Sequence, residues 1–132
     1  MSRTIRLRNV AVVAGLVFAV AAAACTNGSP STAGEDRAVE VTLKEFSITP
    51  AMIPAPSGSA FILRVANQGS VPHALALDAS GQTLETPLLN AGQAFDLAVP
   101  ALDAGHYDVW CTVAGHKQAG MTAKLMADPK IA

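Results

Sequence analysis

The chain of 132 residues is poor in cysteine, histidine and aromatic side chains, and each shortage narrows the classes of protein it can be. Of its two cysteines, Cys25 ends the apolar N-terminal stretch and Cys111 precedes a glycine-bearing loop, so no disulfide framework is expected. The chain has nine Lys and Arg and ten Asp and Glu, and its basic residues form no stripe. Aromatic residues make up only 5% of the chain, so a nucleic-acid-binding surface is not predicted. Helical periodicity is nearly absent, which favours an all-β protein.

The first 24 residues have the features of an export signal. Three arginines lie within the first eight residues, and an apolar, alanine-rich stretch that is short for a membrane span follows at residues 10–24. The small residues before Cys25 are similar to a lipobox, with Ala22 where leucine is usual. This resemblance implies that Cys25 carries a lipid and anchors the exported chain to the outer face of a bacterial cytoplasmic membrane. Conventional cleavage after an Ala-x-Ala site is the alternative, and it would give a periplasmic protein.

The rest of the chain divides into a linker and one domain. Residues 25–38 are small and polar without an apolar period, which is typical of a flexible tether. Residues 39–132 have the size of one small β-sandwich and contain no internal repeat. Once the signal and its three arginines are removed, six Lys and Arg face ten Asp and Glu, so the mature chain has a net charge of −4.

Short runs of alternating apolar and polar residues predict strands throughout the domain. Val39, Val41 and Leu43 alternate with polar residues, and the shift of phase to Phe46 and Ile48 predicts a β-bulge near residues 44–45. The prolines that follow are expected to break the run. Further strands are expected over residues 60–66, 74–77, 93–99, 105–111 and 121–127, and together they predict an all-β sandwich.

Four side chains offer the donor atoms of a copper centre. Cys111, His116 and Met121 stand five residues apart on a loop with two glycines, and His73 lies upstream. A thiolate, two imidazoles and a thioether are the ligands of a mononuclear blue-copper site, in which a trigonal His2Cys group has a weak axial Met. Such a site holds one copper ion as Cu(I) or Cu(II). Each residue alone is better explained by packing or by exposure in a loop, but the residues together favour a metal site.

The sequence around these residues resembles the cupredoxins. Residues 105–111 match the family's strand that ends in the ligand cysteine, Gly115-His116 and Gly120-Met121 match its ligand loop, and residues 67–73 are similar to its Asn-x-Gly…His segment. The resemblance covers roughly residues 39–128. It implies a Greek-key β-sandwich with copper bound by His73, Cys111, His116 and Met121. Ala74 departs from the family, in which an asparagine after the first histidine commonly ties the two ligand loops together.

Strand alternation separates the other residues near the predicted site. Tyr107 shares the face of Cys111, whereas His106 and Trp110 lie on the opposite face. His106 is therefore expected in solvent and without a metal, and the resemblance implies that the Tyr107 hydroxyl bonds back to the preceding turn. Trp110 is interpreted either as a half-buried packing residue or as part of a partner-docking surface. Met126 is expected in the core.

These observations favour a protein without enzymatic activity that shuttles single electrons between membrane-associated redox partners and has no small-molecule substrate. A copper enzyme needs further histidines, and only His106 is left over. A two-copper centre needs a second cysteine in the loop, where there is none. A copper chaperone, storage or resistance lipoprotein is the main alternative, although the Met- and His-rich tracts expected of one are absent. A metal-free sandwich lipoprotein is the remaining alternative.

Overall fold

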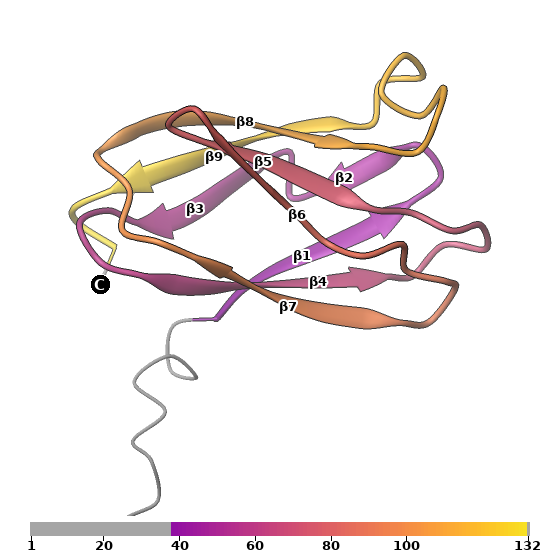
Figure 1. Cartoon of the computed structure of the whole chain (residues 1–132), viewed down its shortest axis with the longest axis horizontal. Helices are drawn as coiled ribbons and strands as arrows, with labels where there is room; N and C mark the ends of the chain where they lie inside the picture. The colour runs from indigo at the N-terminus through magenta and orange to yellow at the C-terminus, as the bar shows by residue number, and fades with distance from the viewer. Residues whose placement is uncertain (1–37, 132) are drawn as a thin grey trace, which may run out of the picture. The chain divides into compact units, whose positions relative to one another are not determined.

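A computed structural model describes residues 38–131, which form a sandwich of nine strands in two layers (Figure 1). No helix occurs among these residues. The strands are β1 (Ala38–Lys44), β2 (Ser47–Thr49), β3 (Met52–Pro56), β4 (Phe61–Asn67), β5 (Leu75–Ala79), β6 (Gln82–Glu85), β7 (Ala94–Val99), β8 (Gly105–Cys111) and β9 (Thr122–Asp128). The expected export signal, Cys25 and the tether up to residue 37 lie outside the described residues.

The two sheets have four and five strands. Their orders are β2-β1-β4-β7 and β3-β9-β8-β5-β6. The pairs β1 with β4 and β3 with β9 are parallel, whereas all other pairs are antiparallel. The chain crosses repeatedly from one sheet to the other, as Greek-key connections do: between β2 and β3, β3 and β4, β4 and β5, β6 and β7, and β7 and β8. The predicted all-β Greek-key sandwich is confirmed.

The core fills the space between the two sheets. In β4, residues alternate strictly between buried and half-buried, as the two-residue period of a strand requires. Leu63, Leu75 and Leu125 come from three different strands and are completely buried. Burial of one such side chain contributes about 1.5–3 kcal/mol. Apolar packing therefore holds the described domain together, since its one cysteine, Cys111, is free.

The predicted β-bulge near residues 44–45 is wrong. The chain turns at Glu45 and Phe46 and returns as β2, so that Leu43 pairs with Ile48 across an antiparallel hairpin. A two-residue turn between strands shifts the apolar phase in the sequence just as a bulge does. Phe46 consequently lies at the hairpin tip, where it is 48% exposed.

Two further expectations fail at one edge of the five-stranded sheet. Of the three prolines expected to break the run, Pro50 does so, since β2 ends directly before it, whereas Pro54 and Pro56 lie within β3, which occupies the edge and pairs with β9. An edge strand tolerates proline because the backbone on its outer side needs no partner. Met126 lies opposite Pro54 and is only partly buried, because Leu125 and Ala127 take the inward positions of β9. The prediction that Met126 belongs to the core is wrong.

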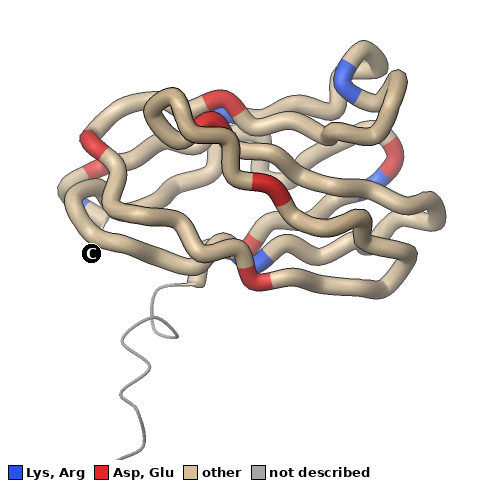
Figure 2. The backbone as a smooth tube through the Cα atoms, viewed as in Figure 1, with Lys and Arg blue, Asp and Glu red and all other residues tan. Residues whose placement is uncertain are grey.

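Charged residues are sparse and dispersed over the strands and turns, and Figure 2 shows no basic stripe on the described part of the chain. The best-formed ion pair joins two strands: the Arg64 guanidinium donates to both carboxylate oxygens of Asp96 at 2.8 and 2.9 Å. Within residues 38–131, no helix has the length and apolar character needed to cross a membrane.

Candidate metal centre

Three connections meet at one end of the sandwich, on the right in Figure 1: the β1–β2 turn, the β4–β5 connection and the β8–β9 loop. Cys111 is the last residue of β8, His116 follows in the loop, and Met121 directly precedes β9. His73 comes from the β4–β5 connection. The Cys111 N–H donates to the Met121 carbonyl at 3.0 Å and closes the base of the loop. The fold thus brings the segments of all four predicted ligands to the same end.

Three of the four donor side chains form a compact triangle. His73 Nδ1 lies 3.1 Å from His116 Nδ1, and Cys111 Sγ lies 3.9 Å from His73 Nδ1 and 3.6 Å from His116 Nδ1. Among the described residues, these three form a group whose donor atoms could hold a metal ion. His73 and Cys111 are buried, whereas His116 is partly exposed. The centre therefore touches solvent through one imidazole.

The triangle has dimensions that fit one first-row metal ion. If the ion is about 2.0 Å from each nitrogen and about 2.3 Å from sulfur, a planar trigonal arrangement separates nitrogen from sulfur by about 3.7 Å. The two observed nitrogen-to-sulfur distances, 3.9 and 3.6 Å, bracket that value. The nitrogen-to-nitrogen distance of 3.1 Å is shorter than the about 3.5 Å of the same arrangement, so the two rings need to move apart slightly around an ion. One thiolate with two imidazoles suits copper, which accepts both kinds of donor in its two oxidation states.

Met121 is fully buried beside this group. Its N–H donates to the His116 carbonyl at 3.0 Å, and its carbonyl accepts from the Cys111 N–H. The backbone of Met121 is therefore bonded to two other predicted ligands. Gly115 and Gly120 have φ values of 84° and 97°, which L side chains rarely adopt and which let the loop turn back within a few residues. The axial role of the Met121 thioether stays a prediction.

Two sets of hydrogen bonds hold the His73 segment where Ala74 replaces the expected asparagine. The Ala74 carbonyl accepts from the Thr112 N–H at 3.0 Å, so a backbone bond joins the two ligand segments. The buried Asn67 amide donates to the Val71 and Leu89 carbonyls at 2.8 and 2.9 Å, and its oxygen accepts from the Gly69 N–H at 2.9 Å. One side chain thereby fixes the turn that leads into His73.

The surroundings of His73 favour a neutral imidazole with a free lone pair. Burial lowers the pKa of His73 below its ordinary value and the nearby His116 ring lowers it further, whereas Glu45 opposes the shift. A metal ligand must be deprotonated at the coordinating nitrogen, so this shift favours metal binding. Phe46 meets the His116 ring edge-on, with ring centroids 5.1 Å apart, and covers part of it.

Sequence reasoning missed the contributions of the β1–β2 turn to the site. Phe46 was expected on a continuing strand, and no role was expected for Glu45, whose carboxylate lies 3.6 Å from His73 Nε2. Both residues precede His73 by more than 25 positions, so no local spacing links them to it. The Asn-x-Gly pattern at residues 67–69 did carry a usable signal, because asparagine side chains commonly bond to the backbone two residues on.

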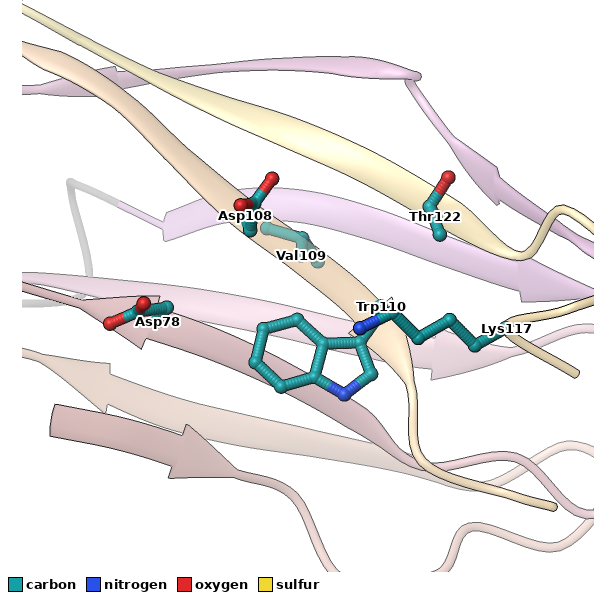
Figure 3. Close-up of a pocket in the computed structure, with 6 residues that line it drawn as sticks. All are labelled: Asp78, Asp108, Val109, Trp110, Lys117 and Thr122. Carbon is teal, nitrogen blue, oxygen red and sulfur yellow. The ribbon is translucent and has the colours of Figure 1, made fainter. Parts of the chain in front are cut away.

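The other residues of β8 lie largely as expected. His106 is exposed, and the Tyr107 hydroxyl donates to the Asp103 carbonyl at 2.8 Å, which confirms the predicted bond to the preceding turn. Trp110 is half-buried on the outer face, and the Lys117 ammonium lies 4.6 Å from the centre of its ring. Figure 3 shows both side chains in a surface pocket that Asp78, Asp108, Val109 and Thr122 also line.

Fold and donor group together define a β-sandwich protein with a single His2Cys centre among its described residues. The family model of the cupredoxin-like domain matches residues 12–123, and the chain belongs to this family. The resemblance seen in the sequence is therefore confirmed. No match is found among curated proteins.

Several solved structures have a similar fold. Dithionite-reduced auracyanin from the photosynthetic bacterium Roseiflexus castenholzii has a TM-score of 0.64 and 16% identity, covering 73% of this chain and 100% of that one. Auracyanin A from Chloroflexus aurantiacus, described as a blue copper protein, has a TM-score of 0.59 and 21% identity over 69% and 98% of the two chains. A reduced amicyanin variant has a TM-score of 0.54 and 22% identity over 70% and 84%. Likeness at these identities establishes the fold.

Proposed function

We propose that this protein is a mononuclear blue-copper protein that carries single electrons between redox proteins. The triangle of His73, Cys111 and His116 donors is the observation that carries this proposal, because a thiolate and two imidazoles at these distances suit copper in both oxidation states. The copper ion, when bound, supplies one-electron oxidation and reduction. The chain supplies the fixed donors, and membership of the cupredoxin-like family supports the assignment.

Apolar side chains at the site end of the molecule support exchange of electrons with protein partners. Phe46 packs on His116 and is 48% exposed. Val71 and Leu88 are also exposed. Val71 lies two residues before His73, and Leu88 lies one residue before Leu89, the bridge partner of His73. Exposed apolar side chains at this end of the sandwich, of which Phe46 contacts the partly exposed His116, form a surface suited to transient protein contact. His116 is the ligand through which the electron enters and leaves.

The visible spectrum tests the proposal directly. The oxidised, copper-loaded chain should be intensely coloured through charge transfer from the Cys111 thiolate, and reductant should bleach it reversibly. The Cys111→Ser variant should be colourless because a hydroxyl replaces the thiolate. A copper carrier is distinguished by a competing Cu(I) chelator, to which it would give up its ion rapidly, whereas an electron-transfer protein should keep it. A colourless wild type, or colour that survives in the variant, contradicts the assignment.

The proposed location rests on the sequence before the described domain. The chain is exported, and Cys25 anchors it by a lipid to the outer face of the cytoplasmic membrane, where membrane-associated donors and acceptors are within reach of the tether. Cys25→Ser should turn a protein that needs detergent for extraction into a water-extractable exported one, because the tether itself is too polar to bind lipid. Identical fractionation of the two forms would show that Cys25 carries no anchor.

A further inference from the structure

The Glu45 carboxylate is held in a fixed place at the tip of the β1–β2 hairpin. Its Oε1 accepts hydrogen bonds from the Ser70 N–H, from the Val71 N–H at 2.9 Å and from the Ser70 hydroxyl at 3.3 Å. The backbone bonds, that from Val71 above all, lower the pKa of Glu45 to about 2. The side chain is therefore a carboxylate ion at neutral pH, and its position is set by the segment that leads into His73.

His73 presents the opposite edge of its ring to this carboxylate. Its Nδ1 faces the other two donors of the centre, so its Nε2 carries the proton whenever Nδ1 binds a metal. The side chain is completely buried, and Nε2 has no hydrogen-bond partner in the described part of the chain. Glu45 Oε1 lies 3.6 Å from Nε2, just beyond hydrogen-bond distance. A buried N–H without a partner is costly, and a small shift of the carboxylate supplies one.

Gly69 gives an independent indication that this space belongs to the carboxylate. A Cβ atom at residue 69 would collide with the Glu45 carboxylate and would lie 2.9 Å from its carboxyl carbon. The φ angle of Gly69 is not in the positive range that requires glycine. Glycine suits residue 69 because it has no side chain, and not because of its backbone freedom.

We propose that Glu45 is a positioning residue of the metal centre: its carboxylate accepts the Nε2–H of His73, orients the ring with Nδ1 toward the metal, and lowers the reduction potential through its negative charge. This inference rests on the proposed copper site. A carboxylate behind a ligand imidazole raises the basicity of that ligand. It also stabilises the more positive oxidation state, because the attraction between charges grows with the charge on the ion.

Three variants separate the role of this charge from that of the fold. Glu45→Gln keeps the length of the side chain and an oxygen that can accept from Ser70 and Val71, but removes the charge. Asp103→Asn is the control, because it removes an equal charge from an exposed residue that precedes β8. This strand spans about 20 Å and ends at Cys111, so Asp103 lies at its opposite end. Gly69→Ala keeps every charge and displaces the carboxylate.

The midpoint potentials of the copper-loaded full chains, followed by visible absorption at pH 7, decide the matter. Glu45→Gln should raise the potential by an amount equal to about a tenfold change in the Cu(II)/Cu(I) equilibrium, which is about 59 mV for one electron. Gly69→Ala should raise it in the same direction, and Asp103→Asn should leave it unchanged. The resonance Raman or EPR spectrum should also change in Gly69→Ala, in which the His73 ring loses its acceptor, and should change less in Glu45→Gln, which keeps a weaker, uncharged acceptor.

Each outcome bears on the inference. If Glu45→Gln shifts the potential no more than Asp103→Asn, or if it lowers thermal stability alone, Glu45 serves the fold and not the metal, and the inference is wrong. If Glu45→Gln does not fold, as judged by circular dichroism, Gly69→Ala decides in its place. A wild type without colour would overturn the proposed copper site itself, whereas a coloured wild type with equal potentials in all variants would overturn only the role of Glu45.

Discussion

Replacing Asn67 by alanine should loosen the turn before His73 and destabilise the whole domain. The Asn67 side chain is 1% exposed and makes three hydrogen bonds, two as donor and one as acceptor. Each bond contributes about 0.5–1.5 kcal/mol net. Alanine also leaves a small void in a buried position. We expect a loss of about 2–4 kcal/mol in the free energy of unfolding, or about 10–25 °C in the melting temperature of a domain of this size.

Urea unfolding of the metal-free chain, followed by the fluorescence of Trp110, measures this loss. Gln68→Ala is the matched control: its side chain is exposed and lies next to Asn67, so its effect should stay within about 0.5 kcal/mol. Asn67→Asp should be at least as harmful as alanine, because it keeps the acceptor but sets a negative charge against two carbonyl oxygens. If alanine costs no more at residue 67 than at residue 68, the amide does not hold the turn and the reasoning is refuted.

Three other predictions concern individual side chains of the site end and of β8. Met121→Gln should lower the reduction potential and Met121→Leu should raise it, because the axial donor sets the potential. Met126→Leu, on the outer face of β9, should leave the potential unchanged. A potential that responds to Met126 alone would reassign the axial ligand. His106→Ala should leave the visible spectrum intact and His116→Ala should remove or transform it, and equal damage from both would contradict the strand phase of β8. Tyr107→Phe should cost about 1 kcal/mol in chemical unfolding by removing one hydrogen bond, and an unchanged stability would show that this bond is not significant.

Strands with one buried face and one exposed face were the predictable part of the fold, and β8 shows why. Its alternation places Val109 and Cys111 inward and His106 outward, which is what a strand with one buried face must do. The β1–β2 hairpin was misread because a tight turn and a bulge shift the apolar phase in the same way. The prolines of β3 were misread because only the strand order reveals which strand lies at an edge.

The residues of the candidate site also differ in how far the sequence predicts them. The spacing of Cys111, His116 and Met121 is local to one hairpin, so the sequence alone pointed to them, and His73 was indicated by the resemblance of residues 67–73 to the family's Asn-x-Gly…His segment. The residues behind these donors were not predictable in the same way. Glu45 reaches His73 only through the pairing of β1 with β4 and the bonds to Ser70 and Val71. Contacts of this kind depend on tertiary structure, and no spacing in the sequence encodes them.

The division of the donors between a hairpin and a distant connection also bears on how the molecule assembles. Cys111, His116 and Met121 need only the antiparallel pairing of β8 with β9, a contact between neighbours in the chain that closes a short loop. His73 joins them only when β5 has docked on β8. The paired residues of these two strands are more than 30 positions apart in the chain. Local contacts form faster than distant ones, so an incompletely folded chain is expected to pass through a stage with three of its four predicted donors in place. Copper present during refolding is expected to meet this hairpin first.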